Sequence, residues 1–270
     1  MFRAVVLGAV QGLTEFVPVS SSAHLVLVPF LLEWDVPSLA FDVAIHIGTL
    51  VALVAYFWRD LGEIVAGAAR RIGGSVDARD RTRARLAWLL VVGSIPAGLT
   101  GIFLEGFFEG LFERPAFVAG ELVVTAAVLV VAETAYARSD PDRRRDIEQM
   151  SVVDALTIGV LQAAAISPGI SRSGATIAGG MVRGLGRESA ARFSFLLSIP
   201  AILGAAIVTV PDLPPGTDPG PVLAASAVAG VTGFAAIAFL LRYLRTRTMH
   251  PFAIYCVALS AISFAAVLAR

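Results

Sequence analysis

Two short polar stretches interrupt otherwise apolar sequence, and they hold the side chains most able to do chemistry. Residues 11–24 read QGLTEFVPVSSSAH, and residues 162–176 read QAAAISPGISRSGAT. The first stretch supplies a carboxylate, consecutive hydroxyls and an imidazole, which suit general acid–base work. The second supplies a guanidinium among hydroxyls, which suits binding of an anion such as phosphate. Ionisable groups inside apolar runs are costly, so they indicate a functional site.

The second stretch carries the features of a phosphate site. A Pro-Gly pair at 168–169 breaks one helix, and the residues after it open the next. The N-terminus of that helix offers free N–H donors and the positive end of the helix dipole. Arg172 adds a planar fork of donors that matches phosphate oxygens, and the hydroxyl donors beside it are Ser171, Ser173 and Thr176. The alternative, in which the hydroxyls cap the helix and Arg172 reaches the membrane surface, explains the break less well.

The first stretch supplies the reactive groups. Glu15 lies one helical turn after Gln11, so the two side chains share a face. Glu15 is a candidate general base, and with the Gln11 amide it is a candidate ligand for a hard divalent cation. His24 is a candidate to move a proton, and the hydroxyls that could attack or bind phosphate are Ser20, Ser21 and Ser22. Two structural alternatives stay open, a buried Glu15–Arg172 ion pair and a hydrogen-bonded, structural His24.

Five further polar side chains fall inside or at the ends of apolar runs. They are Asp42, His46, Glu121, Asp154 and His250. Asp154 is placed to cap the helix that begins the second hairpin, and His250 precedes a proline at the edge of an apolar run. We expect structural roles for all five.

Composition places the chain in a membrane. It has 270 residues, of which 57% are hydrophobic and only 16% charged, whereas a soluble domain averages about 25% charged. The apolar residues gather in runs of roughly the 20 residues that a spanning helix needs. The formal net charge is zero, so composition gives no case for a nucleic-acid partner. The lone Cys256 excludes an intramolecular disulfide, and Gln11 and Glu15 interrupt the first apolar run, so we expect no removable signal peptide.

The apolar runs predict an all-α, polytopic membrane protein that forms a single membrane domain over residues 1–270. Two broken, half-length helix pairs are expected as re-entrant hairpins at 3–32 and 152–185, because broken backbone at membrane depth is tolerated only when it is buried in protein or lines a wet cavity. The predicted spans are 42–58, 86–104, 115–136, 193–211, 222–241 and 251–269. Arginines gather in the connections 59–85 and 138–145, which we therefore expect to be cytoplasmic, with both termini outside.

The two polar stretches repeat each other at an offset of 151 residues. This offset places Gly8 on Gly159, Gln11 on Gln162, and the serines 20–22 on residues 171–173. Each half, 1–136 and 152–269, then holds one hairpin and three spans. Because three is odd, the halves have opposite orientations, and an inverted repeat of this kind places its site near the membrane midplane, where the broken helices meet.

The two stretches resemble the signatures of the undecaprenyl-diphosphate phosphatases, the bacitracin-resistance type of integral-membrane enzyme. Residues 41–49, FDVAIHIGT, and 251–255, PFAIY, also resemble family sequence, so the resemblance covers essentially the whole chain. It implies removal of the terminal phosphate from a long polyprenyl diphosphate. That reaction recycles the carrier lipid for cell-envelope glycan synthesis and confers bacitracin resistance. It also implies a plasma-membrane location, a site open to the outer face, and a divalent cation, Mg²⁺ or Ca²⁺.

Residue by residue, the resemblance makes Glu15 the acidic residue of the first signature, followed by Ser21 and His24. In the second signature it makes the phosphate-binding residues Ser171, Arg172 and Thr176. Gln11 stands where many members carry a second glutamate, which puts a two-carboxylate metal site in question, and Ala23 replaces the more usual glycine. The leaving group is a phosphate, so charge neutralisation and positioning matter most. We expect Glu15 to activate Ser21 or a water.

A second function class uses the same architecture. Inverted repeats with broken helices are typical of transporters, so the site could instead carry a lipid phosphate or another anion across the membrane, as a flippase does. A purely structural scaffold would not explain Arg172 among hydroxyls. The expected partners are the polyprenyl diphosphate lipid and the bilayer. A homodimer stays open, because small residues in the spans permit close packing within or between subunits: Ala201, Gly204, Ala205, Gly230 and Gly233.

Overall fold

The protein is a bundle of helices in a computed structural model, which describes residues 1–35, 39–74, 77–209, 211 and 218–270. The described part holds no strand, and only an isolated bridge joins Arg145 to Leu185. The first six helices are α1 (Phe2–Phe16), α2 (Ser21–Leu32), α3 (Leu39–Tyr56), α4 (Trp58–Ile72), α5 (Ala78–Phe112) and α6 (Pro115–Arg138). The 3₁₀ turns η1 (Pro141–Arg143) and η2 (Ile147–Gln149) follow, and then α7 (Val152–Ala164), α8 (Arg172–Val182), α9 (Arg187–Thr209), α10 (Pro219–Leu244) and α11 (His250–Ala269).

Five of these helices are long and apolar enough to cross a membrane: α5, α6, α9, α10 and α11. Helices α3 and α4 add a sixth if they count as one broken span, and they bend by 74° at their junction. Helices α2 and α7 are apolar but too short to cross by themselves. The chain is a multi-pass membrane protein. Five of the six predicted spans overlap these five helices, whereas the predicted span 42–58 corresponds to α3, which is long enough only together with α4.

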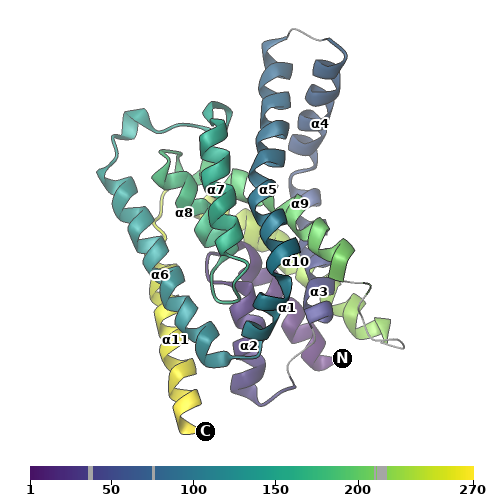
Figure 1. The fold of residues 1–270 in the computed structure, drawn as a ribbon, viewed down its shortest axis with the longest axis vertical. Helices are drawn as coiled ribbons and strands as arrows, with labels where there is room; N and C mark the ends of the chain where they lie inside the picture. The colour runs from purple at the N-terminus through teal and green to yellow at the C-terminus, as the bar shows by residue number, and fades with distance from the viewer. Residues whose placement is uncertain (36–38, 75–76, 210, 212–217) are drawn as a thin grey trace.

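The short helices form two pairs, α1–α2 and α7–α8. Figure 1 shows α7–α8 entering from the end that carries α4, and α1–α2 entering from the opposite end, where both termini also lie. A serine begins the second helix of each pair. The Ser20 hydroxyl accepts a hydrogen bond from the Ala23 amide at 3.3 Å, and the Ser171 hydroxyl accepts one from the Gly174 amide at 3.0 Å. These N-caps satisfy amide groups that a new helix leaves unpaired.

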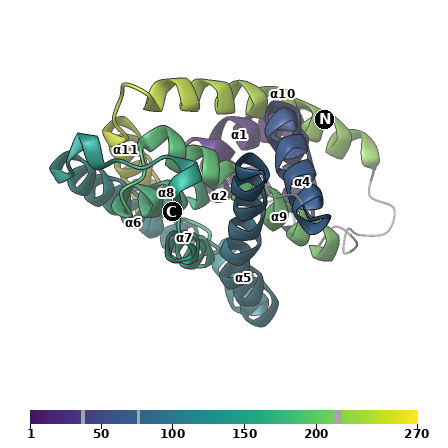
Figure 2. The ribbon, with the colours of Figure 1, turned by 90° about the horizontal axis from the view of Figure 1, so that it is seen from above.

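Glycines let the first helix of each pair lie directly against a long helix. A Cβ atom on Gly8 of α1 would meet the Ala225 carbonyl oxygen of α10 at 2.2 Å, and one on Gly159 of α7 would meet the Gly93 carbonyl oxygen of α5 at 2.3 Å. No side chain fits at either place. Figure 2, seen from above, shows α10 beside α1 and α7 beside α5. Gly230 and Gly233 of α10 pack closely against α3, so these two small residues serve contacts within the chain, whereas nothing lies within 4 Å of a Cβ atom placed on Gly204.

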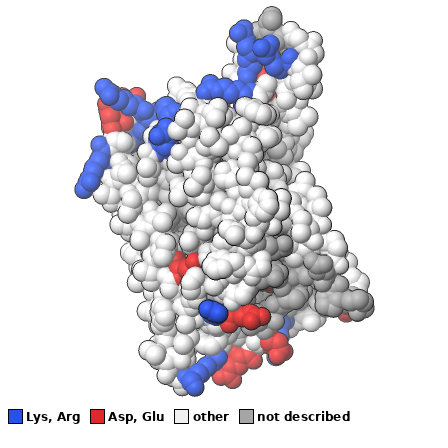
Figure 3. All heavy atoms as spheres, in the orientation of Figure 1, with Lys and Arg blue, Asp and Glu red and all other residues white. Residues whose placement is uncertain are grey.

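Residues 59–72, expected to lie in the connection 59–85, instead belong to the amphipathic helix α4. It packs along α5, which itself runs beyond the predicted 86–104 at both ends. The two helices project together as an arm (Figure 1). Figure 3 shows basic side chains over the tip of this arm and, mixed with acidic ones, over the neighbouring corner, above a broad and largely uncharged belt, with further acidic and basic side chains at the other end. We call the arm's side of the molecule the arginine-rich end.

Candidate active site

The centre of the site is the buried carboxylate of Glu15, in the last turn of α1. Its Oε2 atom accepts hydrogen bonds from Gln11 Nε2 at 2.9 Å and from Ser21 Oγ at 2.5 Å, and His46 Nε2 lies 3.3 Å away. Its Oε1 atom forms an ion pair with the guanidinium of Arg172. Four side chains from α1, α2, α3 and α8 therefore converge on one carboxylate.

Arg172 crosses from one hairpin to the other to reach this carboxylate. It is the first residue of α8, and its side chain is 20% exposed. The recorded bond uses one terminal nitrogen, so the rest of the planar fork is free for further acceptors. Opposite charges this close offset much of each other's desolvation cost, and removing one of them would leave an uncompensated buried charge.

Reciprocal hydrogen bonds hold the two hairpins together beside this pair. The Ser22 hydroxyl donates to the Pro168 carbonyl at 3.0 Å, and the Ser173 hydroxyl donates to the Val17 carbonyl at 3.3 Å. Both donors and both acceptors differ by the same 151 residues. Each hairpin therefore makes the same contact with the other through equivalent residues.

The other predicted phosphate-binding hydroxyls form hydrogen bonds within the protein. Ser20 and Ser171 cap their helices, and each lies 3.2 Å from the hydroxyl of the serine two positions on. The Thr176 hydroxyl donates to the Arg172 carbonyl at 2.7 Å and lies 2.5 Å from the hydroxyl of Ser194. Among the predicted hydroxyls, Ser21 is the one recorded on the Glu15 carboxylate.

His24 is buried one turn into α2 and faces α11. Its Nδ1 atom lies 2.7 Å from the Ser20 carbonyl oxygen, and its Nε2 atom lies 2.8 Å from the Tyr255 hydroxyl. A carbonyl oxygen only accepts, so in the neutral ring Nδ1 carries the proton and Nε2 accepts from Tyr255. The two rings are parallel, with centroids 5.6 Å apart. In the described chain no recorded bond joins His24 to Glu15 or Ser21.

His46 contacts the Glu15 carboxylate, although we expected it to have a structural role at the start of a span. Its Nδ1 atom bonds the Asp42 carbonyl at 2.6 Å, which turns Nε2 toward the carboxylate. Spacing along the chain does not link His46 to Glu15, because it comes from α3. The signal was available only in the family-like run 41–49, which contains it.

The carboxylate that contacts the second hairpin does not belong to that hairpin; it is Glu121 on α6. This side chain accepts hydrogen bonds from the Ser167 hydroxyl and, at 2.8 Å, from the Gly169 amide. Thr125, one turn further on, donates to the Gly169 carbonyl at 3.0 Å and accepts from the Ser171 amide at 2.9 Å. A Cβ atom on Gly169 would lie 2.2 Å from Glu121 Cβ, so the break is pressed against α6.

Gln11 provides a test of whether the site suits a divalent cation. Its Nε2 atom is bonded to Glu15, but its Oε1 atom is buried and has no hydrogen-bond partner in the described structure. The described residues include no cluster of three or more His, Cys, Asp or Glu that could hold a metal ion. Mg²⁺ often takes only one or two protein oxygens and completes its shell with water and substrate phosphates. The Gln11 and Glu15 oxygens fit a cation of that kind.

The fold and site together define a class: a multi-pass membrane protein whose polar centre lies where two broken helix pairs meet. The family model described as bacitracin resistance protein BacA matches residues 4–262, so the chain belongs to the BacA family. It is 42% identical over 274 residues to undecaprenyl-diphosphatase 2 of Frankia casuarinae, covering 97% of this chain and 93% of the relative. It is 42% identical over 262 residues to undecaprenyl-diphosphatase of Moorella thermoacetica, covering 97% and 96%. Undecaprenyl-diphosphatase 2 of Streptomyces coelicolor is 40% identical over 270 residues, covering 97% and 92%.

Proposed function

We propose that the protein hydrolyses undecaprenyl diphosphate to undecaprenyl phosphate and inorganic phosphate. Its membership of the BacA family and the names of its relatives support this activity. The observation that carries it in this chain is the Glu15 carboxylate, which accepts the Ser21 hydroxyl on one oxygen and pairs with Arg172 on the other. A base, a nucleophile and a phosphate-binding cation thus lie together at one point.

In our proposal Ser21 Oγ attacks the terminal phosphorus while its proton passes to Glu15. The bond from phosphorus to the bridging oxygen breaks, and undecaprenyl phosphate leaves with that oxygen. A water, deprotonated by a neighbouring base, then cleaves the phosphoserine and releases phosphate. The short Ser21–Glu15 contact supports this route over direct attack by water. A Ser21→Ala variant that keeps full activity would overturn it in favour of direct attack.

Arg172 and the N-terminus of α8 neutralise the charge of the transferred group. The remaining N–H groups of the guanidinium donate hydrogen bonds to phosphate oxygens, and the first backbone amides of α8 add donors at the positive end of the helix dipole. His46 orients the Glu15 carboxylate, and His24 passes a proton through its hydrogen bond to Tyr255. A cation held by Glu15 and the Gln11 amide oxygen, Mg²⁺ or Ca²⁺, would supply further charge neutralisation at the phosphates.

We also infer the inverted repeat and its orientation. The reciprocal Ser22 and Ser173 bonds and the paired contacts of Gly8 and Gly159 support two halves, 1–136 and 152–269, with re-entrant hairpins that meet near the midplane. The arginine-rich end is cytoplasmic in this proposal, and both termini and the active site face outside. An impermeant thiol reagent applied to intact cells would then label Arg3→Cys and spare Arg71→Cys, and the opposite result would invert the topology.

The test of function is phosphate release from C55 prenyl diphosphate by the purified protein, with and without Mg²⁺. We expect metal-dependent release that Arg172→Ala abolishes. Folded protein that releases no phosphate, but moves the lipid or an anion across liposomes, would favour the alternative transport function. The reciprocal hairpin contact also suits that function. Both hairpins come from one chain, so the site is complete in a monomer, and a homodimer remains a separate prediction for light scattering in detergent.

A further inference from the structure

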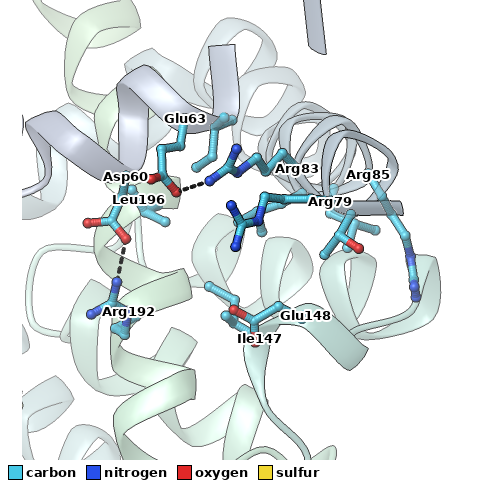
Figure 4. Close-up of a pocket in the computed structure, with 13 residues that line it drawn as sticks. Asp60, Glu63, Arg79, Arg83, Arg85, Ile147, Glu148, Arg192 and Leu196 are labelled. Atoms are coloured by element: carbon cyan, nitrogen blue, oxygen red, sulfur yellow. Dashed lines mark hydrogen bonds and ion pairs between the residues drawn. The ribbon is translucent and has the colours of Figure 1, made fainter. Parts of the chain in front are cut away.

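A cavity lies at the arginine-rich end, and Glu15 is not part of its lining. It has a volume of about 470 Å³ and is bounded by α4, α5, the η2 turn and α9 (Figure 4). The apolar part of its lining consists of Ile64, Leu86, Leu89, Ile147 and Leu196. Apart from Thr82, the rest of the lining is charged. A cavity with an apolar lining and a charged rim suits a ligand that carries both kinds of surface.

Two ion pairs fix the rim. Arg83 of α5 pairs with Glu63 of α4 at 2.5 Å, and Arg192 of α9 pairs with Asp60 of α4. Figure 4 shows these pairs on two sides of the cavity. Within each pair the two charges neutralise each other, and the pairs connect α4 to α5 and to α9.

Arg79 also lines the cavity but belongs to neither of these ion pairs. Figure 4 shows its side chain reaching into the cavity between the two pairs, and no hydrogen bond or ion pair of its guanidinium is recorded in the described chain. Arg85, also in the lining, donates to the neutral carbonyl of Met150 and so keeps its charge. The remaining carboxylate of the lining is Glu148. Four arginines therefore face three carboxylates.

Gly67 fixes the position of one of these arginines. A Cβ atom on Gly67 of α4 would lie 2.5 Å from Arg83 Cβ and 3.2 Å from Arg83 Cδ. The bare glycine backbone thus packs directly on the aliphatic part of the arginine, whose side chain is only 19% exposed. The guanidinium is held at the rim before any ligand arrives, which lowers the entropic cost of binding.

We propose that this cavity binds a phosphomonoester group. A phosphomonoester is close to a dianion at neutral pH and has three strong acceptor oxygens, so it matches the fork of Arg79 and the excess of guanidinium groups around it. The apolar lining includes Leu86 and Leu89, which lie within the candidate membrane span Ala78–Leu104 of α5. The same phosphate chemistry is available from an anionic lipid head group or from free phosphate. The apolar lining favours the lipid.

The test measures binding to the full-length protein in a detergent micelle. Arg172→Ala is used as the background throughout, so that the site at Glu15 does not contribute. The probes are dioctanoyl phosphatidic acid, dioctanoyl phosphatidylcholine and inorganic phosphate. The variants Arg79→Gln and Gly67→Ala alter the cavity. The matched control is Arg59→Gln, an exposed arginine of α4 whose guanidinium lies over the Trp58 ring and outside the cavity lining.

We expect phosphatidic acid to bind and phosphatidylcholine not to bind. Loss of one charge-assisted contact predicts affinity about tenfold weaker or more in Arg79→Gln, a smaller loss in Gly67→Ala, and no change in Arg59→Gln. Melting temperatures of all variants verify folding, and on the wild-type background Arg79→Gln keeps its phosphate-release rate. Phosphate that binds as tightly as phosphatidic acid would identify the free anion as the ligand. Equal affinity in Arg79→Gln and its background, or no binding of either phosphomonoester probe, would overturn the proposal.

Discussion

The two hairpins share a framework but differ in the charge that each contributes. In both, a serine caps the second helix and a hydroxyl two residues later bonds the carbonyl of the opposite break. At offset 151, however, Glu15 of the first hairpin corresponds to Ile166 of the second, and Ser21 corresponds to Arg172. The first hairpin thus brings the base and the nucleophile, and the second brings the cation.

The backbone differs in the same place. Ser20 has φ of 67°, in the left-handed region that an L residue other than glycine rarely adopts, whereas the corresponding Ser171 has φ of −67°. Such a conformation costs on the order of 1–3 kcal/mol and persists only where the surroundings enforce it. The strained break is the one that presents Ser21 to Glu15. The break of the second hairpin, which lacks this strain, is instead held by hydrogen bonds to Glu121 and Thr125 on α6.

The largest expected effect on activity distinguishes the Glu15 carboxylate from the Glu121 carboxylate. Glu15→Gln removes the base and should lower kcat by about 10³-fold, within the range for loss of a general base. Glu121→Gln removes an acceptor of the second break and should cost about 1–3 kcal/mol of stability, with kcat lowered less than about tenfold. Phosphate release and thermal unfolding in the same detergent measure both. An inactive Glu121→Gln protein of normal stability would show that the second hairpin has chemistry of its own.

The next effect concerns the shape of the cation. Arg172→Lys keeps the charge but loses the fork, and we expect kcat/KM to fall by about 10²-fold. The matched change is Arg183→Lys near the far end of the same hairpin, where Arg183 Nε bonds Asp154 at 2.8 Å and Arg145 holds the same carboxylate. That variant should stay within about threefold of the parent. Equal losses in the two variants would mean that Arg172 acts by charge and packing alone.

A smaller effect should follow from the partner of His24. Tyr255→Phe keeps the ring beside the imidazole and removes the hydroxyl on Nε2, so we expect kcat to fall by roughly 2- to 10-fold without loss of stability. Tyr243→Phe serves as the control, because Tyr243 makes ring contacts with Phe239 and Phe252. Unchanged turnover across the pH range in Tyr255→Phe would remove this hydroxyl from the reaction.

The smallest expected effect compares two glutamines at equivalent positions. Gln162 of the second hairpin is buried, and neither amide atom has a hydrogen-bond partner in the described structure. Gln162→Leu should therefore be neutral or stabilising, by up to about 1 kcal/mol. Gln11→Leu should instead raise the Mg²⁺ concentration needed for half-maximal activity several-fold, because it removes a proposed ligand. A titration of phosphate release against Mg²⁺ distinguishes them, and the same response in both would exclude Gln11 as a ligand.

Sequence reasoning located most helices because long apolar runs leave little choice in a bilayer. The predicted 115–136 and 251–269 became Pro115–Arg138 and His250–Ala269. Helix α4 was missed, since its arginines identified the segment as a connection. Its apolar residues nevertheless recur at helical spacing, at Leu61, Ile64 and Val65.

The candidate site was predictable in part, for a similar physical reason. Helical spacing joined Gln11 to Glu15, and the repeat offset related the serines of the two breaks. His46 and Glu121 come from α3 and α6, and only the packing of those helices brings them to the hairpins. The spacing of residues within one helix cannot predict contacts between helices that are far apart in the sequence.

The reciprocal contact between the hairpins also determines when the site can form during synthesis. Glu15 leaves the ribosome early, but its partner Arg172 follows only after more than half of the chain has been made. The surface of α10 that receives Gly8 comes later still. At about 5–20 residues per second, Arg172 follows Glu15 after roughly 8–30 s. Throughout that interval the first hairpin carries a carboxylate that the bilayer disfavours, so we expect it to reach its final depth only after the second hairpin has been inserted.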